Sequence, residues 1–148
     1  MSPLSKATTE AGIGDELLDS LVQTSFGVIG IVTSVAAAHN LSLTLLRVAA
    51  ILRDRTLTMS DLAAHLGLDR STITGLINRA EERGLVRRID NEDDRRSTHV
   101  TLTKTGQTLA KTCAHEISQK IAPLVAPLTT TDAKRLTKLL TLILDAQP

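Results

Sequence analysis

The sequence predicts a mainly α-helical protein with one small β-hairpin. Hydrophobic residues make up 42% of the 148 residues and Phe26 is the only aromatic residue, so an aliphatic core is expected. Apolar residues recur at helical spacing along most of the chain. Only the stretch 85–102 has strand character, with a charged turn in its middle.

The polar residues 1–13 are expected to form a disordered arm. A first helix is predicted from Asp15 to about His39, and it has no charged residue from Ser20 to Ala38. That length approaches the ~20 residues of a membrane span. The run contains several hydroxyl and amide groups and lacks basic flanks, so we expect a helix at a subunit interface and no membrane contact.

Two shorter helices should follow. Ser42 is a plausible N-cap for a helix over 43–53. Ser60 is the candidate cap of a helix over 61–66, which Gly67 would end.

Asp69 can cap the next helix, predicted over 70–83 and ended by Gly84. Two short helices joined by a turn that contains glycine form a helix-turn-helix. Strands are predicted over 85–89 and 97–102, with "DNEDDRR" as the hairpin tip. The combination predicts a winged helix-turn-helix core.

The rest of the chain is predicted to be helical. A helix should run from Thr103 to about Ile121, with Pro123 and Pro127 as breakers. A last helix should start at 131 or 132 and end at 144. The strongly apolar first and last helices predict a homodimer, because a small monomer rarely exposes so much apolar surface.

The helix predicted over 70–83 has two unlike faces. Its buried face is centred on Ile73, and its outer face is slim and polar. The inner positions are Ile73, Leu76, Ile77 and Ala80. The outer positions are Ser71, Gly75 and Asn78. Thr74 and Arg79 lie at the edges of the outer face, and Arg70 lies in the first turn. Such a surface suits the DNA major groove, where amides, hydroxyls and arginines meet base edges and phosphates. An ordinary solvated helix face is the alternative.

Two arginines occupy the predicted hairpin tip. Arg95 and Arg96 follow Asp93 and Asp94. Arginines on a thin hairpin can enter a narrow minor groove. They can equally pair with the neighbouring acids at the surface, and the spacing alone does not separate the two interpretations.

The segment "LTMSDLAAHLGLDRSTITGLINRAEERGLVRRIDNEDDRRSTHVTLTKTG" resembles the winged-helix core of MarR-family transcriptional regulators. The resemblance implies an obligate homodimer on a pseudo-palindromic operator, with the terminal helices at the dimer interface. It also implies repression that a small ligand or oxidation relieves. By position, the resemblance implies four major-groove residues, which are Ser71, Thr72, Thr74 and Asn78. It implies that Arg79 contacts the DNA backbone or a base. In the wing, it implies that Arg96 enters the minor groove and that Asp94 orients Arg96.

Two positions depart from the family pattern. Gly75 stands where many members carry a long, often basic, side chain, so one expected contact is missing. Ala80 replaces the usual leucine behind the recognition helix. The expected organisation is one domain over 14–148, with a DNA-binding lobe at 42–104 and dimerisation helices at 14–41 and 105–148.

A ligand pocket, if present, should be aliphatic, with His39 and Arg47 as its candidate polar groups. The lone Cys113 excludes an intrachain disulfide and is expected to be a buried, inert thiol. The spacing of histidines and carboxylates predicts no metal, and there is no motif for a cofactor or for catalysis.

The net charge of +1 requires any nucleic-acid affinity to come from local placement of charge. The sequence therefore predicts a cytoplasmic, dimeric, sequence-specific DNA-binding repressor with a possible small-molecule effector, and no enzyme. The alternative is a winged-helix protein-interaction module that does not bind DNA, which Gly75 and the near-neutral charge favour.

Overall fold

The computed structural model describes residues 14–90, 92–93 and 97–147. The predicted arm at 1–13 and the wing residues Asp94, Arg95 and Arg96 lie outside the described residues. Six helices and three strands follow one another in the described part of the chain: α1 (Asp15–Ala38), α2 (Leu43–Leu52), β1 (Leu57–Thr58), α3 (Met59–Leu66), α4 (Arg70–Glu82), β2 (Val86–Asp90), β3 (Thr98–Leu102), α5 (Lys104–Val125) and α6 (Thr130–Asp145).

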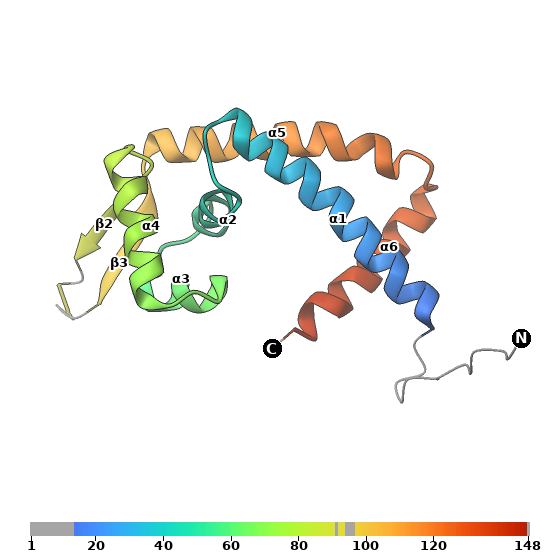
Figure 1. The fold of residues 1–148 in the computed structure, drawn as a ribbon, viewed down its shortest axis with the longest axis horizontal. Helices are drawn as coiled ribbons and strands as arrows, with labels where there is room; N and C mark the ends of the chain where they lie inside the picture. The colour runs from blue at the N-terminus through green and yellow to red at the C-terminus, as the bar shows by residue number, and fades with distance from the viewer. Residues whose placement is uncertain (1–13, 91, 94–96, 148) are drawn as a thin grey trace, which may run out of the picture.

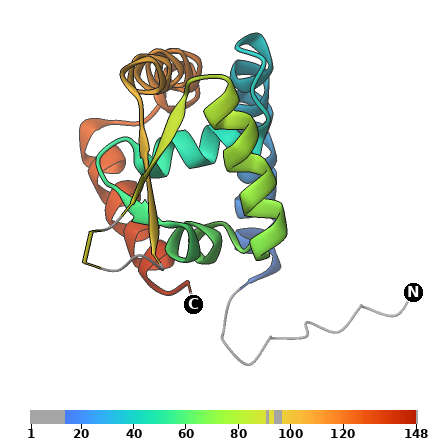
Figure 2. The same ribbon diagram turned by 90° about the vertical axis from the view of Figure 1, so that its left-hand side faces the viewer.

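The helices and strands fall into two regions that α5 connects. The elements α2 to β3 form a lobe at one end, and α5 leads from this lobe to the other end of the molecule (Figure 1). The helices α1 and α6 overlap in that view, yet the perpendicular view places them on opposite sides (Figure 2). The predicted fold class, a mainly helical winged helix-turn-helix with added terminal helices, is confirmed.

Local capping explains where the helices of the lobe begin and end. The side chains of Ser42 and Asp69 accept hydrogen bonds from backbone N–H groups in the first turns of α2 and α4, as predicted. Gly67 has a φ of 64° and Gly84 a φ of 69°, the left-handed conformation that favours glycine after a helix. The cap expected at Ser60 is wrong, because α3 begins at Met59 and the Thr58 hydroxyl accepts from the N–H of Asp61.

The three strands form one antiparallel sheet in the order β1-β3-β2. Val86 lies opposite Leu102 and Arg88 opposite Val100, so the hairpin is the predicted one. The two-residue strand β1, which pairs Leu57 with Val100, was not predicted. It ties the start of α3 to the hairpin and sets the position of the helix-turn-helix against the wing.

The core of the lobe is aliphatic, as the composition predicts. The four positions expected on the inner face of α4 are all buried, and they are Ile73, Leu76, Ile77 and Ala80. They belong to a cluster with residues of α2, α3, the hairpin and α5, including Leu52, Leu62, Val86 and Val100. The aromatic Phe26 is 70% exposed on α1 and takes no part in it.

The two C-terminal helices differ from the expected boundaries. Pro123 does not break α5 but lies in its last turn, because the helix continues to Val125. A proline there lacks the N–H that would donate to the carbonyl four residues earlier, so α5 loses one hydrogen bond close to its end. The last helix begins at Thr130, and Thr129 caps it through the N–H of Asp132.

Two helices carry large exposed apolar surfaces. None of the described residues of α6 is buried, although Leu136, Leu139, Leu140 and Ile143 lie on one side of the helix. On α1 only Val35 and Ala36 are buried. This helix is also long and apolar enough to cross a membrane, with a mean hydropathy of 1.7, but a single such helix is weak evidence because interface helices have the same composition.

Candidate nucleic-acid interface

The start of α4 is organised around the Asp69 carboxylate. Its Oδ1 accepts from the backbone N–H of Thr72 at 2.8 Å and from the Ser71 hydroxyl at 2.8 Å, and its Oδ2 accepts from the Thr72 hydroxyl at 2.9 Å. These hydrogen bonds stabilise the ionised carboxylate, the backbone N–H of Thr72 most of all, and they lower the pKa of Asp69. The first turn of α4 thus presents two oriented hydroxyl groups.

The outer face of α4 is exposed and polar. The predicted contact residues that the structure describes are all exposed there, and they are Arg70, Ser71, Thr72, Thr74, Asn78 and Arg79. The Thr74 hydroxyl donates to the Arg70 carbonyl at 2.7 Å. A Cβ added to Gly75 would meet only the guanidinium of Arg79, at 3.5 Å, so this arginine lies along the groove that the glycine leaves.

Arg88 of β2 links the hairpin to α4 and was missed by sequence reasoning. It donates to Asn78 Oδ1 at 2.5 Å through Nη2 and to Glu81 Oε2 at 2.5 Å through Nη1. One signal for it was available, since "LVRR" places a second arginine on the strand that follows the recognition helix. Nothing in the spacing, however, pairs that arginine with Asn78.

A hollow of about 280 Å³ lies between the start of α3, the outer side of α4 and the hairpin. Arg70, Thr74 and Arg88 line it together with Thr58, Ser60 and Thr98. Its lining therefore combines two guanidinium groups with hydroxyl groups, which is the chemistry that binds phosphate oxygens and base acceptors.

The model of the MarR family matches residues 39–97, which contain the helix-turn-helix and the first strand of the hairpin. This segment of the chain is similar to the MarR family. The chain is 29% identical over 127 residues to the homoprotocatechuate degradative operon repressor of Escherichia coli, covering 85% of this chain and 86% of the repressor.

Solved structures show the same fold over nearly the whole chain. An E. coli MarR mutant complexed with operator DNA has a TM-score of 0.72 at 21% identity, covering 95% of this chain and 99% of that one. NadR in complex with 4-hydroxyphenylacetate has a TM-score of 0.75 at 22% identity, covering 99% of this chain and 100% of that one. Similarity at this identity supports the fold and leaves the ligands to be argued from this chain.

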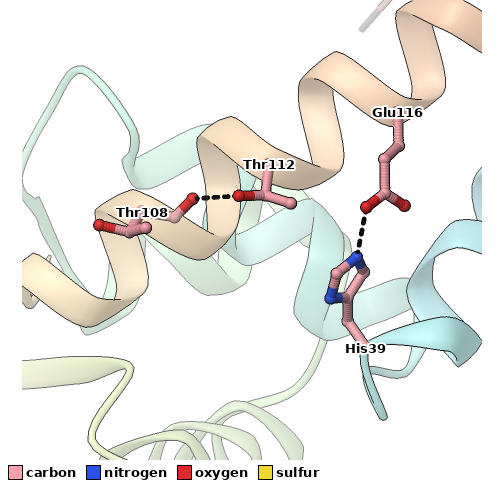
Figure 3. A network of polar contacts seen from close by, with 4 residues as sticks. All are labelled: His39, Thr108, Thr112 and Glu116. Carbon is pink, nitrogen blue, oxygen red and sulfur yellow. Dashed lines mark hydrogen bonds and ion pairs between the residues drawn. The ribbon is translucent and has the colours of Figure 1, made fainter.

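The two predicted ligand residues lie apart. His39, at the end of α1, contacts Glu116 of α5 through Nε2 at 3.0 Å (Figure 3). The guanidinium of Arg83, after α4, donates to the backbone carbonyls of His39 and Asn40. His39 thus has a structural partner on α5 and belongs to the junction of α1, α4 and α5.

Arg47 lies on another side of the lobe, at a small cavity between α1, α2 and α5. The cavity has a volume of about 130 Å³, an apolar wall and the side chains of Arg47 and Arg53. Val32, Leu46, Ala110 and Ile117 contribute to the wall. Arg47 thus lines a cavity with an apolar wall, and His39 is not among its lining residues.

Cys113 is fully buried on α5, as predicted. Burial raises the pKa of its thiol and nearby Glu116 adds to the effect, so the reactive thiolate is disfavoured. Within the described ranges, no three His, Cys, Asp or Glu side chains gather into a group that could hold a metal ion.

Proposed function

We propose that the protein is a homodimeric repressor that binds a pseudo-palindromic DNA operator through α4. The observation that carries the proposal is the outer face of α4, which is exposed over Ser71, Thr74 and Asn78 while the inner face is completely buried. Short polar side chains let a helix approach base edges closely. Similarity to an operon repressor of E. coli supports repression as the outcome.

The dimer follows from the apolar surfaces outside the lobe. Leu139, Leu140 and Ile143 on α6 and Phe26 and Ile29 on α1 are all more than 40% exposed. A second copy of the chain would cover these surfaces and place two α4 helices on one face of the DNA. Two recognition helices about 34–36 Å apart read half-sites one helical turn apart.

The proposed DNA contacts of the wing extend this interface. We assign Arg96 to the minor groove, with Asp94 orienting it and Arg95 beside it, and Arg79 to the DNA backbone or a base. The 130 Å³ cavity at Arg47 is the proposed effector site, for a small molecule with an aliphatic body and an anionic group. NadR, which has the same fold, was crystallised with the small carboxylate 4-hydroxyphenylacetate.

Binding to selected and random DNA duplexes tests the proposal directly. The affinity for both should fall steeply between about 50 and 200 mM salt, because lysine and arginine contacts release counterions from the phosphates. Sequences selected from a random library should contain two half-sites with centres about 10 bp apart. A protein that binds no duplex at low salt would instead support the protein-interaction module.

A further inference from the structure

Arg88 lies between two side chains of α4 and holds both. Its guanidinium contacts Asn78 and Glu81, each at 2.5 Å, and the arginine side chain is 28% exposed. Asn78 and Glu81 are three positions apart on α4, so they are neighbours on the helix surface. The fork of the guanidinium bridges them from β2.

This contact determines which way the Asn78 carboxamide is turned. Arginine has five N–H donors and no acceptor, so only the amide oxygen can face it. The oxygen therefore lies toward the hairpin, and the NH₂ group remains for a partner outside the protein. With its oxygen turned toward Arg88, the amide presents its NH₂ donor group to a partner in the groove.

We propose that Arg88 is a positioning residue that makes Asn78 read hydrogen-bond acceptors in the major groove, so that guanine is preferred to adenine at the contacted position. This inference rests on the proposed function, because it requires α4 to lie in the groove. Guanine presents two acceptors there, N7 and O6, to a single donor group. Adenine instead presents N7 beside the donor N6, and a bidentate contact needs the amide oxygen that Arg88 holds.

A general contribution of positive charge would be the simpler role for Arg88. Arg87 provides the matched control, because it is the preceding residue on β2 and is exposed. Neighbouring residues on a strand point to opposite faces, so Arg87 lies away from the Asn78 side. Loss of either arginine removes one charge, and only the loss of Arg88 releases the amide.

The test is selection of bound sequences from a random DNA library by wild type, Arg88→Met and Arg87→Met. Wild type should select guanine at the Asn78 position. Arg88→Met should shift the ratio of adenine to guanine there by about five- to a hundredfold, the usual range for one bidentate contact. Arg87→Met should lower affinity at every position alike and leave the ratio unchanged.

A measurement without DNA separates this role from the proposed function. In ¹⁵N NMR relaxation, the Asn78 side-chain NH₂ should be ordered in wild type and in Arg87→Met, and mobile in Arg88→Met. Glu81→Gln removes one of the two partners of Arg88 and keeps the arginine. It should change the base ratio and the mobility of the Asn78 NH₂ group in the same direction as Arg88→Met, but by less. It replaces Arg88→Met in the test if that variant does not fold.

Failure of the positioning role and failure of the proposed function give different results. A wild type that selects a DNA site, with an unchanged base ratio in the Arg88 and Glu81 variants, overturns only the positioning role. A wild type that selects adenine at the Asn78 position also overturns only the positioning role. A wild type that selects no site overturns the proposed function and the positioning role together.

Discussion

The helices α4 and α6 both expose a full face, yet the two faces have opposite chemistry. The outer face of α4 is polar, and its inner face is buried in the core. The helix α6 has no buried residue among those described, and its exposed stripe is made of leucine and isoleucine. A polar face needs no cover, whereas an apolar stripe gains free energy when another surface covers it. The contrast supports the two proposed partners, a nucleic acid for α4 and a second copy of the chain for α6.

The two helices also differ in what stabilises them. The α4 helix is held by its cap, by Arg88 and by four buried side chains, so its polar groups are ordered before any partner arrives. The 16-residue α6 helix has its Thr129 cap but no buried residue among those described. Isolated helices of this length are marginal in water, so the proposed dimer contact should also stabilise α6 itself.

The largest expected effect is loss of the dimer. Leu140→Glu places a charge in the apolar stripe of α6, where dimer formation would bury it at a cost of several kcal/mol. Sedimentation should then give the mass of one 15.9 kDa chain, and operator affinity should fall with it. Thr141→Glu adds the same charge beside the stripe and should stay dimeric. Equal masses for the two variants would remove α6 from the interface.

Two glycines provide the next comparison, one in the core and one on the outer face of α4. A Cβ on Gly106 would lie 2.0 Å from the Leu85 carbonyl oxygen, a backbone atom that cannot move aside cheaply. Gly106→Ala should therefore lower the free energy of unfolding by about 3 kcal/mol or more. Gly75→Ala should raise it by up to about 1 kcal/mol, since alanine favours the helix and the space is open. Urea denaturation measures both, and a similar loss in both would contradict the two environments.

Asn78→Ala should weaken binding to the selected operator by about 1–3 kcal/mol, the usual contribution of a base contact. Its affinity for random DNA should change much less, because phosphate contacts dominate there. Fluorescence anisotropy on both duplexes gives the comparison. An equal loss on the two would show that Asn78 touches the backbone and not a base.

The smallest effect concerns the Asp69 cap and appears as a dependence on pH. The pKa of Asp69 is lowered in the folded protein, so its stabilisation is fully present above the ordinary value of 3.8 and is lost as the pH falls through the lowered value. Asp69→Asn should therefore be less sensitive than wild type to pH in that acidic range, as followed by circular dichroism. Asp61→Asn, which removes the first-turn carboxylate of α3, is the matched control.

Much of the lobe formed by α2 to β3 could be predicted from the sequence. Ser42 and Asp69 cap their helices, and Gly67 and Gly84 end theirs, because such signals act within three or four residues of the chain. The buried face of α4 followed from the 3.6-residue period. The exact first or last residue of a helix was harder to predict. Thr58 and Ser60 can both cap α3, and Pro123 and Pro127 can both end α5.

The sequence by itself determined the helices, the hairpin, the aliphatic core and the polar outer face of α4, because local hydrogen bonds and periodicity specify them. Only the tertiary structure decided that Arg88 meets Asn78, that His39 meets Glu116 77 positions away, and that His39 and Arg47 line different places. These contacts depend on how the hairpin packs on α4 and how α5 crosses α1 and α2. Packing of a whole core sets those positions, and no short stretch of sequence contains that information.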